Sequence, residues 1–268
     1  VFLIEAYKNS ALVEFFKGIV VLLVAVLLSI GLNATNLLAT QEYVKESTRG
    51  KSELTINPDK SPKEITNGLN REYITAFSYG KVETLNLFIP RFMGGGSYEN
   101  VGKNSETYAY FKKLGATPIQ ALNEVKQTPT YWGEQPIVEA PAYIGAVVIF
   151  LFILALYLVK GPEKRWLIIG TVMSLLLSYG KNLEFLTDLF IDYFPLYNKF
   201  RAVSSIQVIL ELCIPILAVL ALKELIAKGH DKKEQVKALK NTLFITLGIT
   251  VTLLIFKNSL FDFVGNND

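Results

Sequence analysis

The chain has 268 residues, of which 51% are hydrophobic, and its formal charge is +3 at pH 7. This small positive charge gives no ground for nucleic-acid binding. With one cysteine and one histidine, the chain has no residues for an internal disulfide, a Cys/His metal cluster or a histidine-dependent triad, and we expect no metal and no cofactor.

The apolar residues are concentrated in blocks with few charges, which is typical of a membrane protein. The first block covers residues 18–38. It is too long for the apolar region of a signal peptide, so we expect a transmembrane helix, since about 20 residues cross a bilayer core. Further spans are expected at residues 140–159, 166–183, 204–222 and 242–256.

These blocks lack the alternation of a β-barrel, so they are expected to be helices. The predicted fold class is therefore an all-α polytopic bundle of about five transmembrane helices. Residues 39–139 form a loop region of about 100 residues that we expect to contain short helices.

The distribution of lysine and arginine predicts the orientation of the spans. The short loop "KGPEKR" and the lysine-rich loop at residues 223–241 are expected to be cytoplasmic. The N-terminal segment 1–17 is then cytoplasmic or interfacial. The extracytoplasmic parts are the loop region 39–139, an amphipathic segment at 184–203 and the tail 257–268.

Three capping motifs predict short helices within the loop region. Ser61–Glu64, "SPKE", forms a capping box, and Thr117 followed by proline repeats the device. A third helix is expected to be capped by Asn104 or Ser105 and to end at Gly115.

Polar residues within the fourth predicted span point to a functional or packing role. Gln207 and Glu211 are four residues apart and share one helix face, and Pro215 predicts a kink beside them. An acidic residue in a span suggests a substrate or proton path. A hydrogen bond to another helix explains the same pattern, and both interpretations stand.

Cations and aromatic residues gather near the predicted outer ends of the third and fourth spans. Lys181, Lys199 and Arg201 suit an anionic head group, which arginine can bind bidentately. Tyr197 and Phe200 would line a groove for an acyl or polyprenyl tail. Without further information, the pattern favours an ordinary aromatic belt with anchoring cations.

The outer loop region holds candidates for sugar binding. An aromatic ring can stack on the apolar face of a sugar, while carboxylates and amides bond its hydroxyls. Each carboxylate, taken singly, is more often a structural or solvated group. The candidates are Arg49, Ser52, Glu53, Tyr79, Glu83, Tyr131, Trp132, Glu134 and Gln135.

Five stretches together resemble the bacterial YfhO-type membrane proteins, in the form found in Bacteroidetes. They are "ATQEYVKESTRGKSEL", "SYGKVETLNLFIPRFMGGGS", "YWGEQP" with "AYIGAVV", "LLSYGKN" and "PLYNKFRAVS". The resemblance runs from about the first span to the fourth. Members of this family are much longer, and the sequence begins with Val1, so we expect a central piece of a longer protein.

The resemblance implies a GT-C-like architecture. Such proteins are associated with the addition of sugars to cell-envelope polymers, such as teichoic acids, from polyprenyl-phosphate-linked donors outside the cytoplasmic membrane. Their catalytic carboxylate usually lies in the first outer loop, which here would precede Val1, so the catalytic residue is unknown. A basic residue at the outer end of a late span commonly meets the donor phosphate, which favours Arg201, supported by Lys199 and Lys181.

The leading hypothesis is an integral glycosyltransferase of the bacterial cytoplasmic membrane. Its partners would be a polyprenyl-phosphate-linked sugar, an envelope glycopolymer and membrane lipid. One alternative is a transporter or permease for an envelope precursor, which Gln207 and Glu211 would serve. The other is a non-catalytic subunit of envelope assembly.

Overall fold

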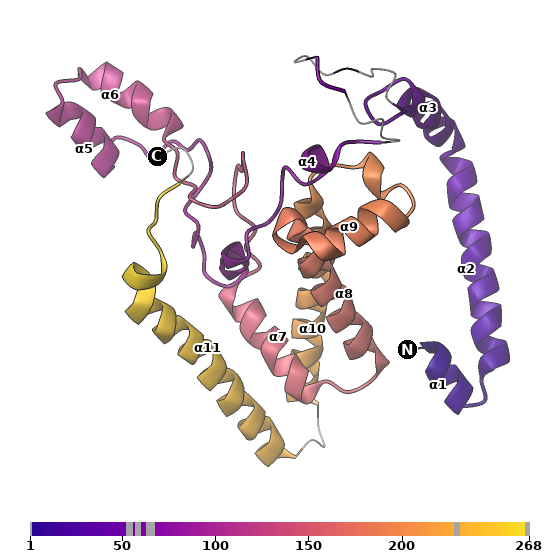
Figure 1. Cartoon of the computed structure of the whole chain (residues 1–268). Helices are drawn as coiled ribbons and strands as arrows, with labels where there is room; N and C mark the ends of the chain where they lie inside the picture. Colours follow the sequence, from indigo (N-terminus) through magenta and orange to yellow (C-terminus); the bar gives the residue numbers. More distant parts are fainter. Residues whose placement is uncertain (1, 52–55, 57–59, 63–67, 228–230, 266–268) are drawn as a thin grey trace.

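The computed structural model describes residues 2–51, 56, 60–62, 68–227 and 231–265 (Figure 1). The candidates Ser52 and Glu53, and Glu64 of the predicted "SPKE" capping box, lie outside these ranges. All regular elements in the described ranges are helical, which agrees with the predicted all-α class.

The α-helices are α1 (Phe2–Lys8), α2 (Leu12–Leu32), α3 (Ala34–Lys45), α4 (Arg71–Ile74), α5 (Glu106–Lys113), α6 (Pro118–Glu124), α7 (Ala146–Leu158), α8 (Pro162–Ser178), α9 (Glu184–Tyr193), α10 (Val208–Ile226) and α11 (Lys232–Leu260). The short 3-10 helices are η1 (Val82–Leu87), η2 (Val125–Gln127), η3 (Gly180–Leu183), η4 (Tyr197–Lys199) and η5 (Val203–Gln207).

Three of the described helical segments are long and apolar enough to cross a membrane. They are Leu12–Leu32, Val203–Ile226 and Lys232–Leu260. The second and third predicted spans correspond to shorter helices, α7 with 13 residues and α8 with 17. At 1.5 Å per residue, α7 reaches only about 20 Å. The predicted count of about five spans therefore rests on these two shorter helices.

The ends of the long helices differ from the predicted ends. The first span begins at Leu12 rather than at residue 18, and Asn33 separates it from α3. The last begins at Lys232 rather than at residue 242, because Asp231 accepts a hydrogen bond from Lys233 N at 2.8 Å. Much of the predicted loop 223–241 is therefore helical.

The second predicted span is shorter than expected because its first residues are not helical. Gly145 has a φ of 115°, and the helix starts only at Ala146. A left-handed or otherwise positive φ favours glycine, which therefore marks the boundary. The third span begins earlier than predicted, at Pro162, and its α-helix ends at Ser178.

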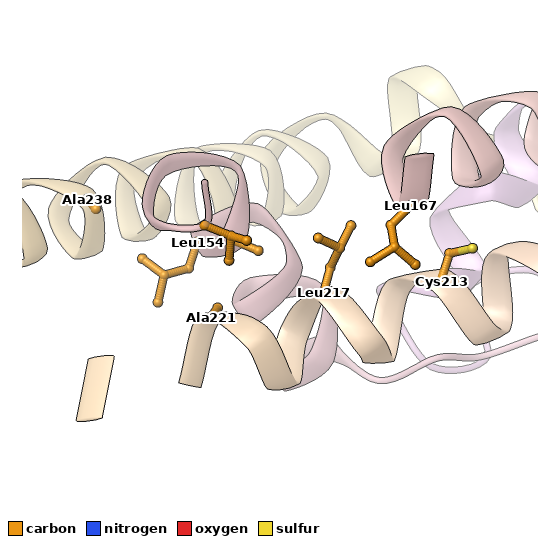
Figure 2. Packing of buried hydrophobic residues seen from close by; sticks show 8 residues of the cluster. Leu154, Leu167, Cys213, Leu217, Ala221 and Ala238 are labelled. Carbon is orange, nitrogen blue, oxygen red and sulfur yellow. The ribbon is translucent and has the colours of Figure 1, made fainter. Parts of the chain in front are cut away.

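Helices α7, α8 and α10 pack around the main apolar core, and α11 joins them (Figures 1 and 2). Leu154, Leu167 and Leu217 are buried at its centre. Ala221 and Ala238 are also buried there, and alanine at such positions lets α10 and α11 approach the bundle closely.

Helix α2 lies differently. It buries no residue, and in Figure 1 it stands apart from α7, α8 and α10. A helix that is apolar on all sides needs an apolar surrounding, which lipid provides. This exposure agrees with a membrane-embedded helix.

Two of the predicted capping motifs are confirmed in the loop region 39–139. Ser105 accepts a hydrogen bond from Tyr108 N and begins α5. Thr117 forms a complete capping box with Gln120 at the start of α6. Both signals lie within four consecutive residues, so sequence alone identifies them.

The segments that carry the candidate site sit over one end of the bundle. Leu87 of η1 packs against Leu210 and Ile214 of α10, and Ile144 N donates to Leu87 O at 3.3 Å. The packing of Leu87 against α10 thus fixes the position of η1, which carries Glu83 of the candidate site.

Candidate functional site

Glu83 is a buried carboxyl group of the loop region 39–139, with 1% of its surface exposed. Its Oε1 accepts hydrogen bonds from Gly80 N at 3.2 Å and from Glu134 N at 2.8 Å. Its Oε2 accepts from Gln135 Nε2 at 3.1 Å. The structure thus brings together two predicted sugar-binding residues, Glu83 and Gln135.

These three bonds give Glu83 a structural role. A buried carboxyl group is costly unless hydrogen bonds satisfy it. Because two of the donors belong to Glu134 and Gln135, Glu83 fixes the loop that carries Trp132 against η1. The sequence indicated the residue types but not this long-range link.

Two buried tyrosines complete the inner part of the site. Tyr79 OH donates to Glu83 O at 2.7 Å, and Tyr131 OH accepts from Gln135 N at 3.1 Å. Burial, and secondarily the charge of Glu83, raise the pKa of both hydroxyls above the usual value. Both therefore stay protonated at neutral pH.

Glu134 is the exposed carboxyl group of the site. Its Oε2 accepts a hydrogen bond from Asn182 Nδ2 at 2.7 Å, and the same amide nitrogen donates to Tyr79 O at 2.9 Å. A Cβ placed on Gly80 would lie 2.9 Å from Glu83 Oε1 and 3.1 Å from Glu134 Oε1. The two carboxyl groups therefore lie close together on one side of Gly80.

A groove of about 480 Å³ runs beside these carboxyl groups. On one side it is bounded by Glu83, Trp132 and Glu134, and on the other by the end of α11 and the residues that follow it, Asn258, Ser259, Leu260, Phe261 and Asp262. It thus combines an aromatic ring with carboxyl and amide groups, a composition that suits a ligand with hydroxyl groups.

The Trp132 ring lies within an aromatic cluster. Its centroid is 5.7 Å from that of Phe92, 5.9 Å from that of Phe261 and 5.2 Å from that of Phe263. The segment after α11 therefore reaches back to the loop at Trp132, a contact between residues far apart in the chain.

Arg201, the favoured phosphate ligand, is exposed and held by aromatic side chains. Its Nη1 donates to Tyr73 OH at 2.7 Å. The guanidinium also lies over the Tyr73 ring at 5.2 Å and the Phe77 ring at 5.9 Å from the centroids. Both distances are within the range of a cation–π interaction.

Arg49 and Lys199 bind each other's backbone. Arg49 Nε donates to Lys199 O, and Lys199 Nζ donates to Arg49 O, each at 2.8 Å. The two residues are 150 positions apart. This exchange fixes η4 against the segment after α3.

Lys181 lines a polar cleft of about 1200 Å³. The cleft is also lined by Arg71, which forms ion pairs with Asp188 at 2.9 Å and Asp192 at 3.1 Å. Asn198, which precedes Lys199 in the chain, lines the same cleft. The three predicted phosphate ligands contact different groups: Lys199 donates to the Arg49 backbone, Arg201 to the Tyr73 hydroxyl, and Lys181 through its backbone N–H to Ser78 Oγ.

The two aromatic candidates in this region differ in burial. Tyr197 packs against a small core of Leu69, Ile74 and Val203. Phe200 has 67% of its surface exposed. Of the two, Phe200 is the side chain that a lipid tail can reach.

Gln207 and Glu211, the polar pair of the fourth predicted span, lie in two different types of helix. Gln207 is buried and its Nε2 donates to Ser178 Oγ at 3.3 Å, whereas Glu211 is exposed. Gln207 ends the 3-10 helix η5, and α10 begins at Val208. Since a 3-10 helix turns faster than an α-helix, the spacing of four no longer guarantees a shared face.

Sequence reasoning missed the residues that hold the site together, namely Tyr73, Gly80 and Asn182. One signal was available, because "SYGK" occurs twice, at residues 78–81 and 178–181. The two copies contact each other, since Lys181 N donates to Ser78 Oγ at 2.9 Å.

No group of three or more metal-ligating side chains is found among the described residues. No protein-family model, curated protein or solved structure matches the chain. Its function is therefore inferred from its residues and their geometry.

Proposed function

We propose that this chain is part of an integral membrane glycosyltransferase of the bacterial cytoplasmic membrane. It would transfer a sugar from a polyprenyl-phosphate donor to a cell-envelope glycopolymer at the outer face. The observation that carries the proposal is the groove in which Trp132 lies beside the exposed carboxyl group of Glu134. The end of α11, one of three described helical segments that are suited by length and composition to a membrane, lines this groove.

In this proposal the groove binds the sugar. Trp132 offers a ring edge or face to the apolar side of the sugar, and Glu134 accepts a hydrogen bond from a sugar hydroxyl. Asn182 orients Glu134 through its bond of 2.7 Å. Glu83 acts indirectly, because its bonds fix the backbone of the loop rather than reach into solvent.

The cationic side chains would bind the donor phosphate. A guanidinium has five N–H donors. In the described structure, the Arg201 guanidinium donates one hydrogen bond to the Tyr73 hydroxyl. The others are suited to phosphate oxygens, and a positive charge there would stabilise the polyprenyl phosphate as it leaves. Phe200, which is exposed nearby in the chain, would contact the lipid.

The orientation in this proposal follows from the lysine-rich loops. Residues 160–165 and the start of α11 would face the cytoplasm, and the loop region 39–139 would lie outside. Sugar groove and phosphate ligands then belong to the same side. The catalytic base is not assigned to a residue of this chain.

The experiment is a transfer assay with the full-length protein in membranes and a labelled polyprenyl-phosphate sugar. Trp132→Ala should raise the KM for the donor or acceptor, because it removes stacking area. Tyr110→Ala is the matched control, since Tyr110 is an exposed aromatic residue of α5. The proposal fails if the full-length protein transfers no sugar from any polyprenyl-phosphate donor, or if Trp132→Ala behaves like the control.

A permease for an envelope precursor is the second candidate, because Glu211 is exposed on a segment that is apolar enough to cross a membrane. Acidic residues at such positions commonly serve substrate or proton paths. If Glu211→Gln stops precursor flux while Arg201→Ala and Trp132→Ala change nothing, the permease explains the chain better than the transferase.

A further inference from the structure

The first turns of α11 form a basic surface that plays no part in the proposed sugar groove. A hollow of about 550 Å³ lies along them. Its lining combines four lysines with apolar and amide side chains: Lys232, Lys233, Val236, Lys237, Lys240, Asn241 and Phe244. We call this set the α11 basic surface.

The α11 basic surface points away from the rest of the protein. The opposite face of the helix carries Ala238, Thr242 and Thr246, which are buried. Lys233, Lys237 and the remaining lysines of the surface are exposed. The lysines are therefore available to a partner outside the chain.

Among the described residues, none of the four lysines of this surface forms an ion pair, although Glu234 lies in the first turn of the same helix. The adjacent Asp231 accepts its hydrogen bond from the backbone N–H of Lys233, not from the ammonium group. Four like charges along one helix face repel each other unless an anion lies between them.

The surface also borders the apolar part of the helix. Phe244 has 74% of its surface exposed, and the exposed Leu247, Val251 and Leu254 follow it. A lysine-rich stretch next to an apolar helix is where a membrane span meets lipid head groups. Long lysine side chains extend from such a position to the head-group phosphates.

We propose that the α11 basic surface binds an anionic phospholipid. The lysine ammonium groups would hold the phosphate of its head group, and Val236 and Phe244 would contact the start of its acyl chains. The two apolar side chains of the hollow, Val236 and Phe244, favour a lipid over a free phosphate ion, which would contact only the lysines. This site is independent of the proposed sugar transfer.

The test uses the purified full chain in detergent micelles, titrated with phosphatidylglycerol or phosphatidylcholine, with bound lipid counted by native mass spectrometry. Wild type should bind phosphatidylglycerol more tightly than phosphatidylcholine. The combined variant Lys233→Gln, Lys237→Gln and Lys240→Gln should lose this preference. The expected loss is roughly fivefold for each lysine.

Two control variants make the outcome specific. Lys103→Gln combined with Lys112→Gln and Lys113→Gln removes the same charge from the outer loop region and should leave the preference unchanged. Replacement of the three α11 lysines with arginine should also preserve it, since the charge remains. Equal phosphatidylglycerol binding by wild type and the glutamine variant would overturn the proposal.

A further measurement separates a lipid site from a simple anion site. Phe244→Ala should weaken phosphatidylglycerol binding, because it removes apolar contact, and inorganic phosphate should then displace the lipid more readily than it does in wild type. If inorganic phosphate displaces the lipid equally well in wild type and Phe244→Ala, the surface binds anions without recognising a lipid, and the proposal is wrong.

Discussion

Tyr79 donates its backbone N–H to the backbone carbonyl of Ser178 at 2.9 Å, which joins the two "SYGK" segments of the chain. The first segment leads into η1 and Glu83, and the second ends α8 and leads into η3 and Asn182. Because Glu83 and Asn182 each hold Glu134 or its backbone, the pairing of these segments determines where the exposed carboxyl group lies.

Gly180→Ala should separate these two segments. Gly180 has a φ of 49°, and a Cβ there would lie 2.1 Å from Ser78 Oγ and 2.6 Å from Val203 Cγ2. We expect left-handed strain of about 1–2 kcal/mol together with an overpacking cost of about 1–3 kcal/mol. The free energy of unfolding in detergent measures this change.

Gly102→Ala is the matched control for this substitution. Gly102 also has a positive φ, 76°, but nothing lies within 4 Å of the position of its Cβ. It should show the strain alone. Equal destabilisation by Gly102→Ala and Gly180→Ala would mean that the close contact with Ser78 does not matter.

Glu83→Gln should destabilise the loop at Trp132. Replacing one carboxyl oxygen by an NH₂ group places a donor against the N–H groups that Glu83 accepts from at present. An unsatisfied buried group costs about 1–3 kcal/mol. Hydrogen exchange of the Glu134 and Gln135 amides would report the loosening.

Glu134→Gln is the comparison for Glu83→Gln, because Glu134 is exposed. Surface substitutions of this kind usually change stability by less than about 0.5 kcal/mol. If both variants leave the amide exchange of the loop as it is in wild type, Glu83 does not have the structural role assigned to it.

The lowered pKa of Glu99 leads us to expect a structural change near Trp132 at acidic pH. Hydrogen bonds from Arg91, and then from Thr130, lower the pKa of Glu99 from 4.5 to about 2. A lowered pKa stabilises the folded state above the ordinary pKa, and this contribution is lost as the pH falls. The window lies between 4.5 and about 2.

Trp132 fluorescence measures this transition in a Trp166→Phe background, since the chain has two tryptophans. Thr130 connects Glu99 to the Trp132 loop through its hydroxyl at 2.6 Å. Glu99→Gln removes the titrating group, so the acid-dependent change in this window should disappear. An unchanged transition in Glu99→Gln would assign it to another group.

Arg201→Ala should lower kcat/KM for sugar transfer, and Arg201→Lys should restore only part of it. Lysine keeps the charge but not the planar pair of donors that suits a phosphate. Loss of a hydrogen bond to a charged group costs about 1.5–3 kcal/mol, which corresponds to a roughly 10- to 100-fold decrease in kcat/KM.

Arg165→Ala is the control for Arg201→Ala, because Arg165 is an exposed arginine at the other end of the bundle, near the start of α8. It should leave kcat/KM near the wild-type value. Equal decreases in both variants would indicate a general effect of surface charge on the membrane protein.

The sequence predicted those features that neighbouring residues determine. The all-α class, the apolar helices and the caps at Ser105 and Thr117 depend on composition and short motifs. The last span is predicted to begin at residue 242, but α11 begins at Lys232, where Asp231 is a good cap, because a lysine-rich stretch is compatible with a loop and with a helix.

The site itself depends on distant contacts, which sequence spacing does not encode. The hydrogen bonds from Glu134 and Gln135 to Glu83 join residues that are 51 and 52 positions apart in the sequence. Arg49 and Lys199, which bind each other's backbone, are 150 positions apart. Residue chemistry identified Glu83, Trp132 and Gln135 as candidates. It did not separate the exposed carboxyl group from the buried one, because that depends on burial in the fold.

The most direct test of the account is the rate of sugar transfer by full-length Glu134→Gln, with Glu106→Gln of α5 as the control. Both side chains are acidic, but only Glu134 lines the groove beside Trp132. We predict that Glu134→Gln lowers kcat/KM roughly 10- to 100-fold, mainly through KM, while Glu106→Gln matches wild type. Wild-type kcat/KM in folded, membrane-inserted Glu134→Gln would contradict the assignment of this groove as the sugar-binding site.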